Sequence, residues 1–282
     1  MTKYTILLII LISLFSCESD DTIQVQPQLV VEGWIDSDGF PVVILTTTAP
    51  IDEHKQSISS LEDYVVKWAK VTVSDGEQEV VLTGKVDKDY FPSFIYTTGQ
   101  MRGFAGKTYK LRVEYDDYYA EAETTIPQKI EVDSFKVARL GKDSQYYGLH
   151  AYFEDNPSEK NYYKFFVYTS SSPYRSFTSA RLGLINDEVI TGTTICAPIH
   201  RDHSITEWDD YEQNFTFAEI VRVKIAQIDS IGYQFWKSYE EASTLSRNPL
   251  FPTTKSLRSN VNGALGYWLG YGSSKYTIIM IE

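Results

Sequence analysis

One short stretch of the chain brings together side chains that can bind a metal ion. Cys196, His200 and His203 offer a thiol and two imidazoles, which are suitable donors for zinc. Acidic side chains that can complete the set follow closely: Glu207, Asp209 and Asp210. The spacing matches no recognised zinc signature, and Pro198 and its neighbours are typical of an ordinary exposed loop. We therefore expect no metal, with Cys196, His200 and His203 kept as the alternative.

Signatures of catalysis are missing from the rest of the sequence. There is no Gly-x-Ser-x-Gly nucleophile elbow and no His-Glu-x-x-His zinc helix. The glycines between 263 and 272 lack the lysine and the Ser/Thr residue of a phosphate loop. Among 38 acidic residues a close pair arises by chance, so carboxylates alone do not indicate a glycosidase. We expect a protein that is not an enzyme and needs no cofactor.

Cys17 follows a segment with the features of a secretory signal. Lys3 precedes an apolar run over residues 6–12, and the small Ser16 stands directly before the cysteine. As a helix, residues 4–16 would be about 20 Å long, well short of the roughly 30 Å hydrocarbon core of a bilayer. The segment therefore does not predict a membrane span in the mature protein.

The residues that lead to Cys17 resemble the lipobox of bacterial lipoproteins. Their order is Leu14-Phe15-Ser16-Cys17, with a bulky leucine where a soluble secretory signal has a small residue. In a lipobox the thiol is alkylated with diacylglycerol, the signal is cleaved and the new amino terminus is acylated. Phe15 departs from the usual small or branched residue. We expect residues 1–16 to be a signal peptide and residues 17–27 to be a flexible tether lipidated at Cys17.

Ser19, Asp20 and Asp21 form a short acidic run behind the lipidated cysteine. Taken alone, such a run is a solvated linker. Directly after a lipidated cysteine it resembles the signal that exports lipoproteins of the Bacteroidota to the outer face of the outer membrane. We therefore expect a protein anchored in the outer membrane and facing the cell exterior.

The charge of the chain argues against two classes of partner. The formal net charge is −12, and removal of residues 1–16 takes away one lysine and leaves −13. Nucleic acid and anionic lipid both attract basic surfaces, so neither is an expected partner. Attachment to the membrane then depends on the lipid at Cys17 alone. Because Cys196 is the only other cysteine, no disulfide forms within the mature chain.

The first part of the mature chain has the pattern of an antiparallel β-sandwich. Asp38-Gly39 and Asp75-Gly76 are hairpin turn signals between β-rich runs. Apolar Tyr109, Leu111 and Val113 alternate with charged residues, as in a strand with one buried face. We predict a mainly β fold in which residues 28–127 form an immunoglobulin-like sandwich without its disulfide.

A second β-rich domain is predicted for residues 128–282, because Ile126-Pro127-Gln128 ends the first series of strands. One short helix is expected near residues 230–246, capped by Asp229 or Ser230. Its apolar residues recur at three- and four-residue steps, which indicates packing on a sheet. Gly-rich residues 262–272 are predicted to be irregular and to precede a last strand over residues 276–281.

Three stretches of the sequence resemble one lipoprotein family. They are LVVEGWI in the first strand, PVVILT after the first turn, and the run SNVNGALG over residues 259–266. With the lipobox, they are similar to the family called domain of unknown function 4249, over nearly the whole mature chain. The resemblance implies a surface or outer-membrane lipoprotein made with a TonB-dependent receptor, and it assigns no catalytic residue.

Two functions remain open from the sequence. The first is an accessory subunit of a TonB-dependent transporter, acting as a lid, a substrate-capturing subunit or a stabilising subunit. The second is an autonomous surface lipoprotein that binds glycans or peptides as nutrients. The second function predicts an exposed aromatic platform built from some of the five tryptophans: Trp34, Trp68, Trp208, Trp236 and Trp268.

Overall fold

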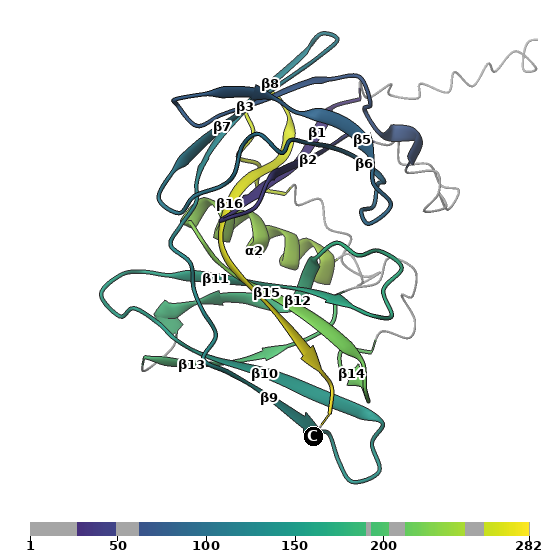
Figure 1. The fold of residues 1–282 in the computed structure, drawn as a ribbon, viewed down its shortest axis with the longest axis vertical. Coiled ribbons are helices and arrows are strands. Elements are labelled where there is room, and N and C mark those ends of the chain that lie inside the picture. The colour runs from purple at the N-terminus through teal and green to yellow at the C-terminus, as the bar shows by residue number, and fades with distance from the viewer. Residues whose placement is uncertain (1–26, 49–61, 190–192, 203–211, 246–256, 282) are drawn as a thin grey trace, which may run out of the picture.

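The chain folds mainly into β-strands (Figure 1). Strand residues make up 53% of this computed structural model and helical residues 9%, which confirms the prediction of a mainly β protein. The residues that the structure describes are 27–48, 62–189, 193–202, 212–245 and 257–281.

An eight-stranded sheet runs through both parts of the molecule. In spatial order its strands are β12 (Thr178–Asn186), β11 (Tyr162–Thr169), β15 (Ile220–Ile228), β16 (Leu265–Ile279), β1 (Leu29–Asp36), β2 (Pro41–Thr47), β6 (Phe94–Thr97) and β5 (Thr83–Val86). Neighbouring strands are antiparallel except β1 and β16, which run parallel. The first and last strands of the chain therefore lie side by side.

Two smaller sheets complete the β structure of the described residues. The first consists of β4 (Glu79–Val81), β3 (Lys70–Ser74), β7 (Thr108–Tyr115) and β8 (Tyr118–Thr125). The second consists of β13 (Thr194–Ile199), β10 (Tyr146–Glu154) and β14 (Phe215–Thr216), with β9 (Ser134–Arg139) paired to β10. A short 3-10 helix, η2 (Asp187–Val189), follows β12.

The first small sheet packs against the large sheet around Trp268. Leu111 and Val113 of β7 share one buried cluster with Val31 of β1 and with Trp268 of β16. The Trp268 indole Nε1 donates a hydrogen bond to Tyr109 O at 3.0 Å, so its polar atom is satisfied inside the core. Two facing sheets with a common core fit the predicted sandwich, while its immunoglobulin-like topology stays a prediction.

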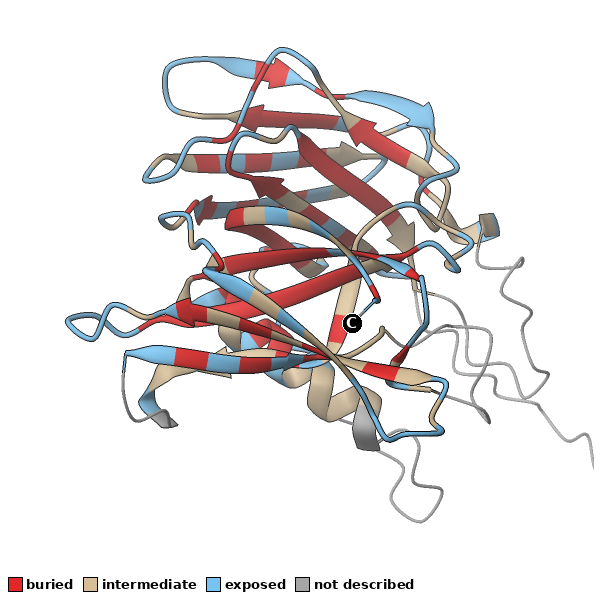
Figure 2. Ribbon diagram, turned by 60° about the horizontal axis from the view of Figure 1, so that its bottom comes forward, coloured by how far each residue is buried: buried red, intermediate tan, exposed pale blue. Residues whose placement is uncertain are grey.

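The second small sheet packs against the other half of the large sheet. Phe153 of β10, Phe165 of β11 and Ile225 of β15 lie together in a second core and are fully buried. Figure 2 shows that buried residues follow the inner strands, whereas exposed residues gather at edges and turns.

Helix α2 (Ser230–Leu245) covers the opposite face of the large sheet. It begins where Asp229 Oδ1 accepts the Gly232 N–H at 2.7 Å, which confirms Asp229 as the cap. Phe235 and Trp236 pack on Tyr267 and on neighbouring sheet residues, as the helix pattern predicted.

Strand β16 links the two halves of the molecule. Residues 265–271 pair with β1, and residues 272–279 pair with β15. The prediction that residues 262–272 are irregular is wrong from Leu265 onward, because the glycines there make room for neighbouring backbone. A Cβ at Gly272 would collide with the backbone of Pro127 and Gln128, and one at Gly270 would lie only 3.0 Å from Ile126, in the linker that crosses this strand. The predicted division of the chain at Pro127 stays a prediction.

Replacement of Gly272 by alanine tests this crossing. Its Cβ would overlap the carbonyl oxygens of Pro127 and Gln128, which are backbone atoms that cannot rotate away. We expect Gly272→Ala to lower the free energy of unfolding by about 1–3 kcal/mol in urea denaturation. Gly99→Ala is the matched control, because a Cβ at Gly99 meets no atom within 4 Å. Equal stabilities for the two variants would show that the linker backbone is not in close contact with β16 at Gly272.

Candidate functional site

A buried ionic cluster lies where the two halves of the large sheet meet. Asp36, the last residue of β1, accepts hydrogen bonds from Lys224 Nζ and Lys275 Nζ, both at 3.1 Å. Lys224 projects from the middle of β15 and is only 3% exposed. Its ammonium lies 4.3 Å from the ring centroid of Phe166 and 4.6 Å from that of Tyr271. A carboxylate and two aromatic faces thus compensate for the water that this cation loses.

The two charges of this cluster depend on each other. Burial alone would raise the pKa of Asp36, but the charges and hydrogen bonds of Lys224 and Lys275 outweigh burial and hold that pKa below its ordinary value. Burial lowers the pKa of Lys224, and Asp36 offsets part of this effect. Asp36 belongs to the first part of the chain and both lysines to the second, so the cluster joins the two parts.

A polar pocket of about 470 Å³ opens beside this cluster. It lies between the linker after β8, the turn after β1 and the outer part of β16. We call it the junction pocket, and its lining residues are Ser37, Asp38, Lys129, Glu131, Ser273, Ser274, Lys275 and Tyr276. The lining offers ammonium, carboxylate and hydroxyl groups, which can orient a polar ligand but form no catalytic arrangement that we recognise.

Ser37 ties the turn after β1 to the strand β16. Its N–H donates to Tyr271 O at 2.8 Å, and its Oγ accepts the Ser273 N–H at 3.0 Å. Next to it, Asp38 forms an ion pair with Lys129 of the linker, which holds the pKa of Asp38 below its ordinary value. Contacts between the turn after β1, the strand β16 and the linker after β8 therefore hold the walls of the junction pocket together.

The structure does not bring the predicted metal ligands Cys196 and His200 together. The prediction of an exposed loop at Cys196 is wrong, because residues 194–199 form β13. At about 3.3 Å per residue their Cα atoms are about 13 Å apart, too far for ligands about 2 Å from one zinc ion. Across the described part of the chain, no three Cys, His, Asp or Glu residues are close enough to hold a metal. His203 lies outside the described residues, so the metal alternative stays a prediction.

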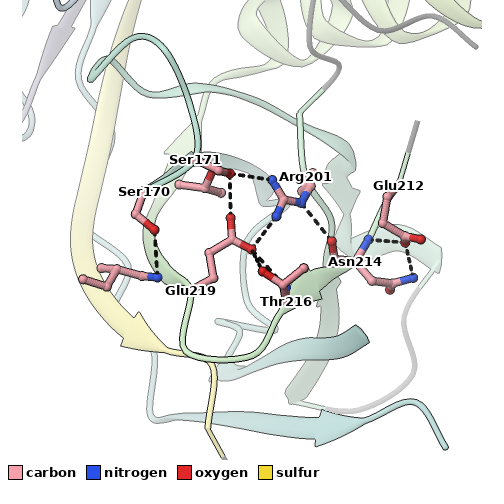
Figure 3. A network of polar contacts seen from close by, with 9 residues as sticks. Ser170, Ser171, Arg201, Glu212, Asn214, Thr216 and Glu219 are labelled. Carbon is pink, nitrogen blue, oxygen red and sulfur yellow. Dashed lines mark hydrogen bonds and ion pairs between the residues drawn. The ribbon is translucent and has the colours of Figure 1, made fainter. Parts of the chain in front are cut away.

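The residue after His200 belongs to a structural network instead (Figure 3). Arg201 pairs with Glu219 through Nη2 and donates from Nε to Asn214 O at 2.8 Å. Glu219 also accepts Ser171 Oγ at 2.9 Å and the Thr216 N–H at 3.0 Å. This network fixes β14 and the turn into β15. Burial and the charge of nearby Arg181 lower the pKa of His200, and its Nδ1 has no hydrogen-bond partner among the residues described.

The four described tryptophans do not form one platform. Trp236 is buried between α2 and the large sheet, and Trp268 is buried in the core between the first small sheet and the large sheet. Trp34 is half-buried and packs at 6.1 Å from Tyr90, whereas Trp68 is 91% exposed. Trp208 lies outside the described residues.

The predicted lipid site and export signal also lie outside the described residues. Cys17 and the run Ser19 to Asp21 precede residue 27, where the description begins. Within the described ranges, no helix has the length and apolar character that a bilayer crossing requires.

Sequence reasoning missed Asp36, Lys224 and Lys275. The local pattern gave no signal, because Lys224 alternates with the apolar Val223 and Ile225 in IVRVKIAQI and so has the position of a solvated lysine. Its partner Asp36 is 188 residues away, and local pattern cannot reveal such a pair.

The family model of the Domain of unknown function (DUF4249) matches residues 12–277. The chain belongs to this family. No curated protein matches the chain. This match confirms the resemblance found in the sequence. The matched residues include the lining of the junction pocket and both halves of the large sheet.

Removal of the Asp36 charge tests the ionic cluster. Asp36→Asn leaves Lys224 buried without its counter-charge, and we expect a loss of about 3–5 kcal/mol in the free energy of unfolding. The double variant Asp36→Asn, Lys224→Met should recover most of that loss. Glu114→Gln, which breaks the exposed pair with Lys70, is the control and should cost at most about 1 kcal/mol. A single Asp36→Asn variant as stable as this control would contradict the assignment.

The same pair predicts a specific dependence of stability on pH. Because the folded-state pKa of Asp36 is lowered, its contribution is present above the unfolded pKa of about 3.9 and is lost as the pH falls through the folded value. The stability difference between the wild-type protein and Asp36→Asn should therefore shrink below about pH 4. Urea denaturation of both proteins between pH 7 and pH 2.5 measures it, and a constant difference would refute the prediction.

Proposed function

We propose that this protein is a lipid-anchored lipoprotein of the outer-membrane surface that acts as an accessory subunit of a TonB-dependent transporter. The observation that carries the proposal is the lipobox ending in Cys17, ahead of a fold that belongs to the family over nearly its whole length. The expectation that the partner is a TonB-dependent receptor comes from the resemblance to this family. A lid, a substrate-capturing subunit or a stabilising subunit are the forms that this role can take.

The attachment of the fold to its tether supports this proposal. Tyr118 Oη donates to Pro27 O at 2.5 Å, directly before β1 begins at Leu29. Ten residue steps separate Cys17 from Pro27 and span at most about 36 Å when extended. A lipid at Cys17 would therefore hold the first sandwich close to the membrane surface, within reach of a transporter.

An exposed apolar group at the far end of β16 also supports a protein partner. Phe217, Ile220, Ile279 and Ile281 are between 43% and 65% exposed, and Ile220 is the cross-strand partner of Ile279. Such groups on a strongly acidic protein are typical of a contact surface.

Co-purification from native membranes tests the proposal. Mild detergent extraction and pull-down of the wild-type protein should recover a TonB-dependent barrel, identified by mass spectrometry. The control is Cys17→Ala, which cannot be lipidated and should be lost from the membrane fraction together with the co-purified barrel. Recovery of the wild-type lipoprotein alone would count against the transporter role.

The alternative function is an autonomous glycan- or peptide-binding surface lipoprotein without a fixed transporter partner. The observation in its favour is the junction pocket, whose polar lining suits a hydrophilic ligand. Ligand binding by the isolated lipoprotein, combined with an absence of any barrel in the pull-down, would favour this alternative.

A further inference from the structure

The outer half of β16 has one edge that no described strand covers. β1 ends at Asp36, opposite Tyr271, whereas β16 continues to Ile279 with β15 as its neighbour on the other side. No strand of the described residues takes the place of β1 beyond this point. The backbone N–H and C=O groups along this edge therefore have no strand partner among the described residues.

The hydrogen-bond pattern identifies which backbone groups face the open edge. The Met280 N–H donates to Glu219 O at 2.9 Å, so even-numbered residues of β16 direct their backbone groups toward β15. The alternate residues Lys275, Thr277 and Ile279 therefore direct theirs away from β15. All three residues are exposed. Of their backbone groups, the Ile279 carbonyl oxygen already accepts the Ile281 N–H at 2.8 Å. Open edges of this kind are templates for pairing with another strand.

The turn after β1 already pairs with the start of this edge. Ser37 uses its N–H and its Oγ to satisfy Tyr271 O and the Ser273 N–H, in the manner of one further strand residue. Beyond Ser37 the same line of β16 passes Lys275, which belongs to the lining of the junction pocket. The open edge thus continues directly from a position where the protein itself forms strand-like hydrogen bonds.

The chemistry of the pocket matches a peptide. Lys129 and Lys275 are already paired with Asp38 and Asp36, whereas Glu131 makes no ion pair with a described residue and offers its carboxylate. A peptide carries an ammonium at its amino terminus, and its backbone repeats donors and acceptors about every 6.8 Å, which is the two-residue repeat of a strand. A sugar chain has no matching row of alternating amide donors and acceptors.

We propose that a short extended peptide binds as an added strand along residues 275–279 of β16, with one end in the junction pocket. This inference rests on the proposed function, because it names the ligand class that a capturing subunit would take. The peptide backbone pairs with Lys275 and Thr277, while the ammonium at the peptide's amino terminus meets the carboxylate of Glu131.

Binding is tested on the full mature lipoprotein in detergent, without any transporter. The probe is a tryptic digest of casein, and bound peptides are separated by gel filtration and identified by mass spectrometry. The most enriched peptide is then synthesised and titrated by calorimetry, and maltooligosaccharides are titrated as the second ligand class. We expect saturable peptide binding that maltooligosaccharides do not compete.

Two changes to the backbone decide whether the edge is the binding site. Thr277→Pro removes an N–H from the open edge and no hydrogen bond to β15, so we expect peptide affinity to fall at least 10-fold. Thr277→Ala is the matched control, which keeps the N–H and should bind as the wild type does. The second change is made in the peptide, where N-methylation of alternate residues should weaken binding to the wild-type protein without any effect on its folding.

The outcomes separate this inference from the transporter role. Unchanged binding by both Thr277→Pro and the N-methylated peptides would overturn it, as would binding of maltooligosaccharides only. Self-association of the wild type that Thr277→Pro abolishes, without peptide binding, would assign the edge to a second copy of this chain and also overturn it. Co-purification of a barrel is measured with the wild-type protein and without added peptide, so it tests the proposed function by itself.

Discussion

The shared strand β16 is the constraint on which the rest of the structure depends. Its residues 265–271 belong to the sandwich of the first part, and its residues 272–279 belong to the second part. Because one continuous strand supplies hydrogen bonds to both parts, neither part can turn away without loss of a ladder. The close approach of the linker over Gly270 and Gly272 follows from the same arrangement, since the chain must cross β16 to pass from one small sheet to the other. The fold therefore requires glycine at positions where the local sequence suggests a loop.

The ionic cluster around Asp36 makes this arrangement specific. A buried ion pair adds little net stability compared with apolar packing, because both charges lose water. It does penalise any arrangement in which Asp36 and Lys224 are separated, since each would then be buried alone. Asp36 comes from β1 and Lys224 from β15, the two strands that flank β16. We infer that the pair selects the register of β16 rather than contributing much to the total free energy of folding.

Local patterns in the sequence predicted most of the strands and the helix, because burial there follows local alternation. Tyr109, Leu111 and Val113 were identified from a period of two, and α2 from its period and its cap at Asp229. Two kinds of feature were missed. The start of β16 at Leu265 was hidden by glycines whose purpose is contact with distant backbone, and β13 was taken for a loop because of Pro198. The candidate site was missed for a related reason, because its residues come from segments at least 91 positions apart. They meet only through the parallel pairing of β1 with β16 and the linker that crosses β16.

The position of the junction pocket has a consequence for any ligand that enters it. Ser37 and Asp38 come from the first part of the chain, whereas Ser274 and Lys275 come from the second. A ligand that contacts both sets binds best when the two parts hold their present relation, so its binding free energy stabilises that relation. A partner that binds the exposed apolar residues near Ile279 and alters the relation of the two parts would therefore change the affinity for the ligand. By linkage, the ligand would change the affinity for that partner by the same factor. The shared strand is therefore suited to couple a captured molecule to a partner protein, because the pocket and the apolar group lie on the same fifteen residues and their immediate neighbours.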